Sequence, residues 1–389
     1  MNARVKPADV LPTRRLPFEC VALVLQGGGA LGAYQAGVYA ALAEAEIDPD
    51  WVAGISIGAI NAAIIAGNPP ETRVDRLREF WTLVTTDATR SWQGDIGLAK
   101  TDDVRTLINQ MSANASLMHG AKGFFSARRT SPWLAAPGTI EATSFYDTRD
   151  LKGTLERLVD FDRLNAAGTT RVSVGAVNVR TGNLVCFDTT THTIRPEHVM
   201  ASGALPPGFP AVEIEGEHYW DGGLVSNTPL QWVAESQPRR DTLAFQVDLW
   251  SARGELPRDM LEVGTREKEI RYSSRTRANT DQFKHVQKLR RAASELLDRL
   301  PAADRSSPEA KFLAAEADRK VYGLVQLTYR PRNHEGHSKY YAFSRLSMEE
   351  QWDAGYHDAV RALRHPQVLE RPDSNDGVSV FDLHVDGRE

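Results

Sequence analysis

The chain has 389 residues, of which 41% are hydrophobic and 25% are charged, as in ordinary globular proteins with one large or two smaller domains. Its net charge of −5 gives no general reason to expect a nucleic-acid partner. The two cysteines, Cys20 and Cys186, match no metal-binding spacing, and no run approaches the about 18 apolar residues of a membrane-spanning helix. We therefore expect a cytoplasmic protein without a metal or cofactor, and a peripheral contact with a membrane stays open.

The chain opens with a segment, residues 1–17, that contains Arg and Pro and predicts a flexible tail rather than a signal peptide. The apolar run at 20–25 then predicts a buried strand. It leads directly into Gln-Gly-Gly-Gly-Ala-Leu-Gly at 26–32, and residues 33–43 have helix-forming character. The sequence thus predicts a glycine-rich loop between a strand and a helix.

Three interpretations compete for this loop. Gly27, Gly29 and Gly32 satisfy G-x-G-x-x-G, but a dinucleotide site also needs an acidic residue after the next strand, and Asp48 and Asp50 come before it. A phosphate-binding P-loop needs G-K-[ST], which is absent. The third interpretation is a loop whose backbone N–H groups bind an oxyanion, and the simplest alternative to all three is a tight turn.

The next loop contains G-x-S-x-G, with Gly54, Ser56 and Gly58 between an apolar run and a helix-forming run at 59–66. This spacing is typical of a nucleophile elbow, a sharp strand-to-helix turn that exposes one hydroxyl group. Taken alone, the motif is also compatible with a serine that merely caps the helix. A parallel βαβ unit would place this loop beside the glycine-rich loop, which favours the oxyanion interpretation.

The middle of the chain alternates between helical and strand patterns. It predicts helices at 71–85, 150–158 and 195–202, and strands at 171–178, 183–188 and 242–249. The segment 91–142 carries Trp, Met and Phe among Gly, Ser and Pro with weak periodicity. It is either a surface insertion or a lid that lines an apolar pocket near the site.

Asp221 follows a strand-like stretch and precedes Gly222 and Gly223. Asp-Gly alone usually marks a turn, but a serine nucleophile needs a base, so Asp221 is the candidate. His218 lies close in sequence and is either a residue that tunes Asp221 or an ordinary surface histidine.

These motifs, in this order, resemble the patatin-like phospholipase family over residues 18–250. The resemblance rests on 27–32 (GGGALG), 54–58 (GISIG) and 221–223 (DGG), and extends to the segment 201–210 and to Asn227-Thr228-Pro229. It implies a three-layer α/β/α sandwich with a mainly parallel central sheet.

The resemblance also implies a serine acyl hydrolase with a Ser56–Asp221 dyad and no histidine. Backbone N–H groups at Gly27, Gly28 and Gly29 would hold the oxyanion, and an acyl-enzyme would form on lipid or other ester substrates. Gly32, Gly54, Gly58, Gly222 and Gly223 would support these motifs. One departure is Leu31, where many relatives carry Arg or Lys, so phospholipid, acylglycerol, thioester and polyester substrates all stay open.

The C-terminal third, residues 251–389, predicts a mostly helical extension. A basic run from 266 to 291 indicates one or two long helices, either a solvated face or a surface for anionic membranes. We expect a strand at 321–329 that pairs with 340–343, a helix at 347–363 and an edge strand within 378–385.

Two alternatives remain open at this point. An α/β-hydrolase would need a late histidine, such as His334, His337, His357 or His365, but its elbow usually follows several strands, whereas Ser56 follows one βα unit. A catalytically silent lipid-binding or scaffold protein would have no need for Ser56, Asp221 and the glycine loop together.

Overall fold

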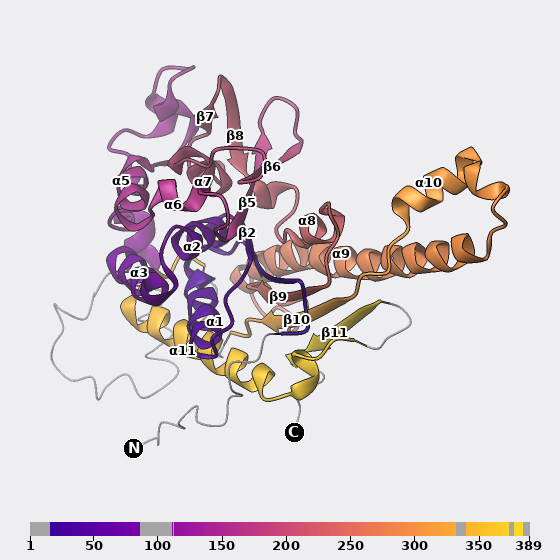
Figure 1. Cartoon of the computed structure of the whole chain (residues 1–389). Coiled ribbons are helices and arrows are strands. Elements are labelled where there is room, and N and C mark those ends of the chain that lie inside the picture. Colours follow the sequence, from indigo (N-terminus) through magenta and orange to yellow (C-terminus); the bar gives the residue numbers. More distant parts are fainter. Residues whose placement is uncertain (1–15, 86–110, 112, 332–339, 373–376, 384–389) are drawn as a thin grey trace.

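The computed structural model describes residues 16–85, 111, 113–331, 340–372 and 377–383 (Figure 1). Its centre is a nine-stranded sheet in the order β11-β10-β9-β1-β2-β5-β8-β7, with β6 paired to β5. The strands of this sheet are β1 (Cys20–Leu25), β2 (Trp51–Ile55), β5 (Arg171–Asn178), β6 (Leu184–Asp188), β7 (Val212–Ile214), β8 (Glu217–Asp221), β9 (Thr242–Asp248), β10 (Tyr322–Thr328) and β11 (Val378–Asp382).

The sheet is parallel from β11 to β5, and β6, β7 and β8 add antiparallel pairs at one side. Strands β1, β2 and β9 are buried along their whole length. Strands covered on both faces read as continuous apolar runs, which is why the sequence indicated them. A separate two-stranded hairpin joins β3 (Ser126–Ala127) to β4 (Tyr146–Asp147).

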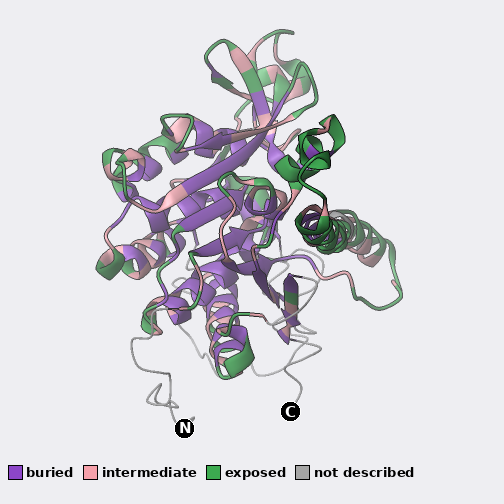
Figure 2. Cartoon of the chain, turned by 45° about the vertical axis from the view of Figure 1, so that its right-hand side comes forward, coloured by how far each residue is buried: buried purple, intermediate pink, exposed green. Residues whose placement is uncertain are grey.

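Helices cover both faces of the sheet, so the predicted three-layer α/β/α sandwich is confirmed. Alternate side chains of β1 enter two different cores: Leu23 packs with the layer of α1, α2, α3 and α11, and Val24 packs with α8 and α9. Figure 2 shows the buried sheet between these layers. The α-helices are α1 (Gly32–Glu44), α2 (Ile57–Ala66), α3 (Pro70–Val84), α5 (Arg149–Leu158), α6 (Phe161–Asn165), α7 (Pro196–Ser202), α8 (Leu230–Glu235), α9 (Met260–Arg299), α10 (Pro308–Glu316) and α11 (Arg345–Leu363).

Short 3-10 helices complete the connections. They are η1 (Gly29–Leu31), η4 (Pro132–Leu134), η5 (Ile140–Thr143), η6 (Gly222–Leu224), η7 (Asp304–Ser306) and η9 (Pro366–Val368). None of the helices in the described ranges is both long and apolar enough to cross a bilayer.

The C-terminal third contributes to the same sheet. Strands β10 and β11 extend it beyond β9, and the expected edge strand at 378–385 is confirmed as β11. The basic run forms one helix, the 40-residue α9, which projects from the body with α10 near its far end (Figure 1). The expected pairing of 340–343 with β10 is wrong, because β9 and β11 occupy both edges of that strand.

Helix α11 packs directly on α1 through two glycines. A Cβ atom on Gly37 of α1 would lie 1.9 Å from the carbonyl oxygen of Trp352, and one on Gly355 of α11 would lie 2.0 Å from that of Tyr34. Only glycine allows the two helix backbones to approach so closely. The contact therefore joins the C-terminal helix to the helix that follows the glycine-rich loop.

We predict that Gly355→Ala destabilises the whole protein. The added methyl group would force α1 and α11 apart, and overpacking of this kind costs about 1–3 kcal/mol. Chemical denaturation measures the change. Gly264→Ala on α9 is the matched control, because no atom lies within 4 Å of its added Cβ. Equal unfolding free energies for Gly355→Ala and wild type would contradict the tight contact.

Candidate active site

Ser56 lies on a strained turn between β2 and α2. It has φ 57° and ψ −123°, a left-handed conformation that residues with a side chain rarely adopt. Its N–H group donates to the Ser202 hydroxyl oxygen at 2.9 Å, which holds the turn in place. The serine is half-buried, in agreement with the elbow geometry that the motif predicted.

The motif glycines are required by close backbone contacts. A Cβ on Gly54 would lie 2.3 Å from the Gly58 carbonyl oxygen, and a Cβ on Gly58 would lie 2.3 Å from that of Leu25. Gly32 similarly leaves room for Ile57, whose Cγ1 would be 2.5 Å from an added Cβ. The spacing G-x-S-x-G thus lets the start of α2 press against β1 and β2.

The glycine-rich loop lies beside the serine. A Cβ on Gly27 would be 3.0 Å from Ser56 Cβ. The Gly27 N–H group already donates to the Asn227 carbonyl oxygen at 3.3 Å, whereas those of Gly28 and Gly29 have no acceptor in the described part of the chain. Gly29 has φ 59°, so a side chain there would be strained. Gly28 and Gly29 are therefore the available backbone donors among the predicted three.

Asp221 ends β8 and is buried next to Ser56. Burial raises the pKa of its carboxyl group to about 6, while hydrogen bonds from the Ser56 side chain and the Gly223 N–H group oppose that rise. The Gly223 bond measures 2.7 Å to Asp221 Oδ1. Gly222 is needed here, because a Cβ would lie 2.5 Å from the Gly175 carbonyl oxygen. The structure thus brings together the serine and the aspartate that sequence motifs singled out.

Asn227 connects the two motif loops. Its Nδ2 donates to the Gly27 carbonyl oxygen at 2.9 Å. Its Oδ1 would lie 2.5 Å from a Cβ on Gly27 and 2.8 Å from a Cβ on Gly223. From the sequence, Asn227 stood out only as part of the family resemblance, because an isolated Asn carries no signal for such a bridge.

Residues of the C-terminal third cover the glycine-rich loop. The carbonyl oxygen of Tyr340 accepts from the Ala30 N–H group at 3.0 Å. The Tyr340 ring stacks on the Trp250 ring, with the two centroids 4.0 Å apart. Trp250 Nε1 donates to the Gly27 carbonyl oxygen at 2.6 Å. Sequence reasoning missed these contacts, because nothing local in Trp250 or Tyr340 indicates which loop they touch.

Helix α9 also reaches the site. Arg271 and Tyr272 line a cavity of about 70 Å³ together with Gly223, Leu224 and Asn227. Burial, followed by the negative charge of Asp221, raises the pKa of Tyr272. A cationic side chain therefore lines the same cavity as Gly223 and Asn227, although it comes from outside the motifs. Leu31 of the glycine-rich loop is fully buried.

Of the histidines of the triad alternative, the two that the structure describes, His357 and His365, do not join this site. His334 and His337 lie outside the described residues. His357 is exposed on α11, His365 packs on Phe381, and His218 is exposed on β8. In the described ranges, no histidine donates to or accepts from Ser56 or Asp221, and no cluster of three metal-binding side chains occurs.

The dinucleotide alternative fails on geometry. Asp48 and Asp50 precede β2, whereas the glycine-rich loop follows the parallel strand β1. The aspartates thus lie at the opposite edge of the sheet from Gly27, where neither reaches a ribose bound at the loop.

The segment 91–142 lies partly outside the described residues, which omit 86–110 and 112. In its described part, Phe124 and Phe125 are buried in an aromatic cluster, with Phe125 5.2 Å from Phe209 and 5.8 Å from Phe343. Trp133, by contrast, is 85% exposed. That the segment 91–142 acts as a lid stays a prediction.

A comparison with protein-family models agrees with this geometry. The patatin-like phospholipase model matches residues 23–234, more than half of the 389-residue chain. The chain belongs to the patatin-like phospholipase family. A second model, described as patatin phospholipase, matches residues 270–375. This patatin-like protein thus carries family sequence in its C-terminal third as well.

Individual relatives match over short stretches. The patatin-like phospholipase domain-containing protein M110.7 of Caenorhabditis elegans is 39% identical over 69 residues, which are 18% of this chain and 6% of that protein. Lysophospholipase nte1 of Aspergillus terreus is 55% identical over 53 residues, 14% of this chain and 4% of that protein. VipD from Legionella pneumophila is similar at a TM-score of 0.39 and 16% identity, covering 89% of this chain and 67% of that one.

We predict that Asp221→Asn stabilises the protein above about pH 6. The folded protein holds the Asp221 proton up to about pH 6, whereas an unfolded aspartate releases it near about pH 4. Stability therefore falls as pH rises between these values, and the loss reaches about 3 kcal/mol at higher pH. Asparagine avoids this loss and can still accept from the Gly223 N–H group.

Chemical denaturation at about pH 8 and about pH 4 measures the difference. The variant should exceed wild type at the higher pH, and its advantage should shrink at the lower pH. The exposed substitution Asp162→Asn is the control. A variant that is less stable than wild type at the higher pH would show that Asp221 is not buried as a costly charge.

Proposed function

We propose that this patatin-like protein is a serine acyl hydrolase that cleaves carboxylic esters of lipids through a Ser56–Asp221 dyad. One observation carries the proposal: Ser56, on a strained turn, lies against the buried carboxyl group of Asp221, and its side chain opposes the rise that burial causes in the pKa of that group. Two backbone N–H groups without acceptors in the described part, those of Gly28 and Gly29, belong to the loop beside it. The nucleophile, base and oxyanion donors of acyl transfer are thus adjacent.

The proposed reaction has two steps. The Ser56 oxygen attacks the ester carbonyl carbon while Asp221 accepts the hydroxyl proton. The tetrahedral intermediate places its negative oxygen at the N–H groups of Gly28 and Gly29, and the alcohol leaves with the proton from Asp221. Water then attacks the acyl-enzyme, gives its proton to Asp221, and releases the fatty acid and the Ser56 hydroxyl group.

The environment of Asp221 suits the role of base. A free aspartate, with a pKa of about 3.9, is a weak base at neutral pH. Burial raises the pKa of Asp221 to about 6, closer to the range in which it can both accept and return a proton. Helix α2 begins directly after Ser56, and its N-terminal N–H groups favour negative charge at this position.

We predict that ester turnover rises with pH through about pH 6 and then levels off, because the carboxylate is the active form of Asp221. Ser56→Ala and Asp221→Asn should each lower kcat by about 100-fold or more. Hydrolysis of a soluble short-chain ester measures both effects. Ser379→Ala on the exposed face of β11 and His357→Ala are the controls, and both should retain activity.

A collapse of activity in His357→Ala would revive the triad. Full activity in Ser56→Ala would contradict the dyad, and a wild type without turnover on any ester would favour the silent lipid-binding alternative.

We further propose that the substrate is a phospholipid whose phosphate lies against Arg271. The proposal is supported by Arg271, which lines the cavity next to Gly223, whereas Leu31 of the glycine loop carries no charge. Arg271 is exposed and ion-paired with Glu267, its neighbour one helical turn away. An exposed pair of this kind is weak, so a phosphate can compete for the guanidinium group.

We predict that Arg271→Gln raises KM for a lysophospholipid by about tenfold and leaves a neutral monoacylglycerol within about twofold, because only the former carries a phosphate. Steady-state kinetics on the two substrates measures the ratio. Arg299→Gln, at the far end of α9, removes the same charge and should change neither. Equal effects on both substrates would rule out phosphate recognition by Arg271.

A contact with a lipid surface is also part of the proposal. The β3–β4 hairpin is joined to the loop after Gly203 by the Tyr146 N–H group, which donates to the Gly208 carbonyl oxygen at 2.9 Å. A Cβ on Gly203 would lie 4.0 Å from Ser56 Cα. Exposed apolar side chains sit within or beside this hairpin: Leu117, Met118, Trp133, Leu134 and Ile140. Such a patch can enter the interface of a membrane.

We predict that Trp133→Ser lowers the fraction of protein bound to phospholipid vesicles several-fold, since a tryptophan that is 85% exposed is removed. Turnover of a soluble ester should stay unchanged. Co-sedimentation measures binding, and Phe312→Ser, on the 70% exposed Phe312 of the distant α10, is the control. An equal loss of vesicle binding in Trp133→Ser and Phe312→Ser would contradict a particular role of the hairpin in membrane contact.

A further inference from the structure

A second cavity lies at the opposite edge of the sheet from Ser56. It has a volume of about 620 Å³ and is lined by residues that precede β2, begin β5 and precede β9. Ser56 follows the other end of β2, so the two sites are separated by the length of that strand, roughly 15 Å. The cavity is therefore distinct from the proposed catalytic site, and its volume falls in the range of small-molecule sites.

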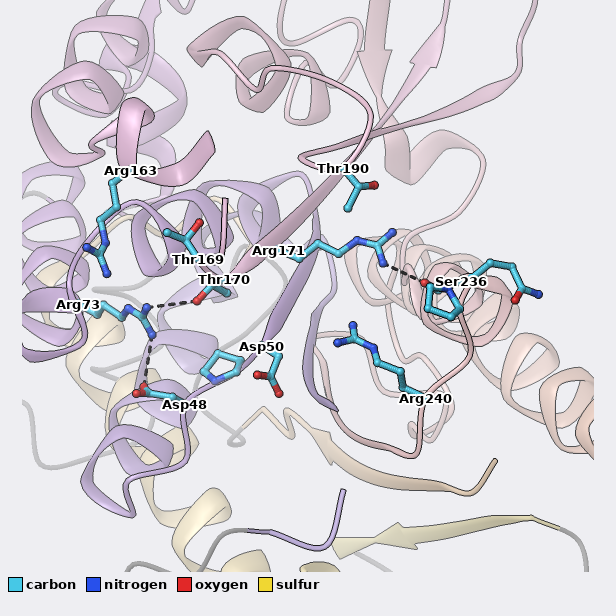
Figure 3. Close-up of a pocket in the computed structure, with 14 residues that line it drawn as sticks. Asp48, Asp50, Arg73, Arg163, Thr169, Thr170, Arg171, Thr190, Ser236 and Arg240 are labelled. Carbon is cyan, nitrogen blue, oxygen red and sulfur yellow. Dashed lines mark hydrogen bonds and ion pairs between the residues drawn. The ribbon is translucent and has the colours of Figure 1, made fainter. Parts of the chain in front are cut away.

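The lining of this cavity is basic and rich in hydroxyl groups. Four arginines face two aspartates, although the chain as a whole is acidic. Figure 3 shows Arg163 and Arg240 reaching toward the space from opposite sides, with Asp50 between them. The polar lining residues include Asp48, Asp50, Arg73, Arg163, Thr169, Thr170, Arg171, Thr190, Ser236 and Arg240.

Two of the arginines are fixed in the walls. Arg73 is 4% exposed and donates to the Asn68 carbonyl oxygen at 3.0 Å and to Asp48 at 3.3 Å. Arg171 binds the Asp188 carboxylate and lies over the Trp51 ring at 3.8 Å. These side chains are held before any ligand arrives, so the walls are preorganised.

The other two arginines have weaker partners: the pKa of Glu19 is lowered by its bond to Lys320 and, to a smaller extent, by the charge of Arg240. Neither Arg163 nor Arg240 forms an ion pair with a residue in the described ranges. Arg163 Nε is buried and has no hydrogen-bond acceptor there. A buried donor without an acceptor costs free energy.

We propose that this cavity binds a small phosphorylated polyol. Its phosphate groups accept hydrogen bonds from Arg163 and Arg240, because guanidinium groups match phosphate oxygens in pairs. Asp48 is exposed on the other wall and accepts hydrogen bonds from ligand hydroxyl groups. A ligand with both kinds of group satisfies the lining better than a simple anion, which the two aspartates would repel.

Calorimetric titration of the full chain with fructose 1,6-bisphosphate tests this proposal, with fructose and inorganic pyrophosphate as comparison probes. We expect saturable binding of one bisphosphate per chain, weaker binding of pyrophosphate and none of fructose. Arg163→Gln and Arg240→Gln should each weaken bisphosphate binding by about tenfold or more. Arg129→Gln, an exposed arginine outside the cavity, should stay within about twofold of wild type.

Arg163→Gln and Arg240→Gln are also compared with wild type in their folding and their activity. Thermal unfolding and turnover of a soluble ester should match wild type for both variants, since neither residue belongs to the Ser56 site. Absence of saturable binding to both phosphate probes, or equal weakening by Arg129→Gln, would overturn the proposal.

An experiment with lipid vesicles distinguishes a phosphorylated lipid head group from a free phosphorylated metabolite. Vesicles that contain phosphatidylinositol 4-phosphate are compared with neutral vesicles by co-sedimentation. If the protein binds only the phosphorylated vesicles, and if Arg163→Gln and Arg240→Gln weaken that binding, the same phosphate site is supported. Its ligand is then a lipid head group. Binding of the soluble bisphosphate alone would support a free phosphorylated metabolite.

Discussion

The site depends on one buried side-chain amide, that of Gln26 at the end of β1. Its Oε1 accepts from the N–H groups of Leu249 and Trp250, at 2.6 and 3.0 Å. Its Nε2 donates to the hydroxyl oxygens of Thr228 and Thr276, at 3.0 and 3.1 Å. Gln26 is completely buried, so each lost bond would leave an unpaired polar group. This network joins the glycine-rich loop to β9, to α9 and to the segment that carries Asn227.

The same network explains why the C-terminal third is joined structurally to the candidate site around Ser56. Helix α9 supplies Thr276 to Gln26, and Tyr340 supplies a carbonyl oxygen to the glycine-rich loop. Helix α11 contacts the helix after that loop through glycines that leave no room for a side chain. The strained Ser56 and the buried Asp221 both cost free energy, and contacts of this kind hold them in place.

Sequence reasoning succeeded where a local constraint selects the residue. Gly54 and Gly58 stand where any Cβ would collide with backbone, and β1 is buried on both faces, so their patterns are visible in the sequence. It failed where the contact joins distant parts of the chain. Gln26 closes an apolar strand with a polar side chain, which was a usable signal, but its partners lie more than 200 residues away. The segment 340–343 was expected to pair with the strand at 321–329, and the position of Tyr340 over the loop has no local cause.

Whether Ser56 is an activated nucleophile can be measured by intact-mass analysis after labelling with a fluorophosphonate. These probes form a covalent bond to an activated serine and need no knowledge of the natural substrate. We expect one adduct on wild type, mapped to Ser56 by peptide analysis and absent from Ser56→Ala. An adduct that persists on Ser56→Ala, or a folded wild type that forms none, would contradict it.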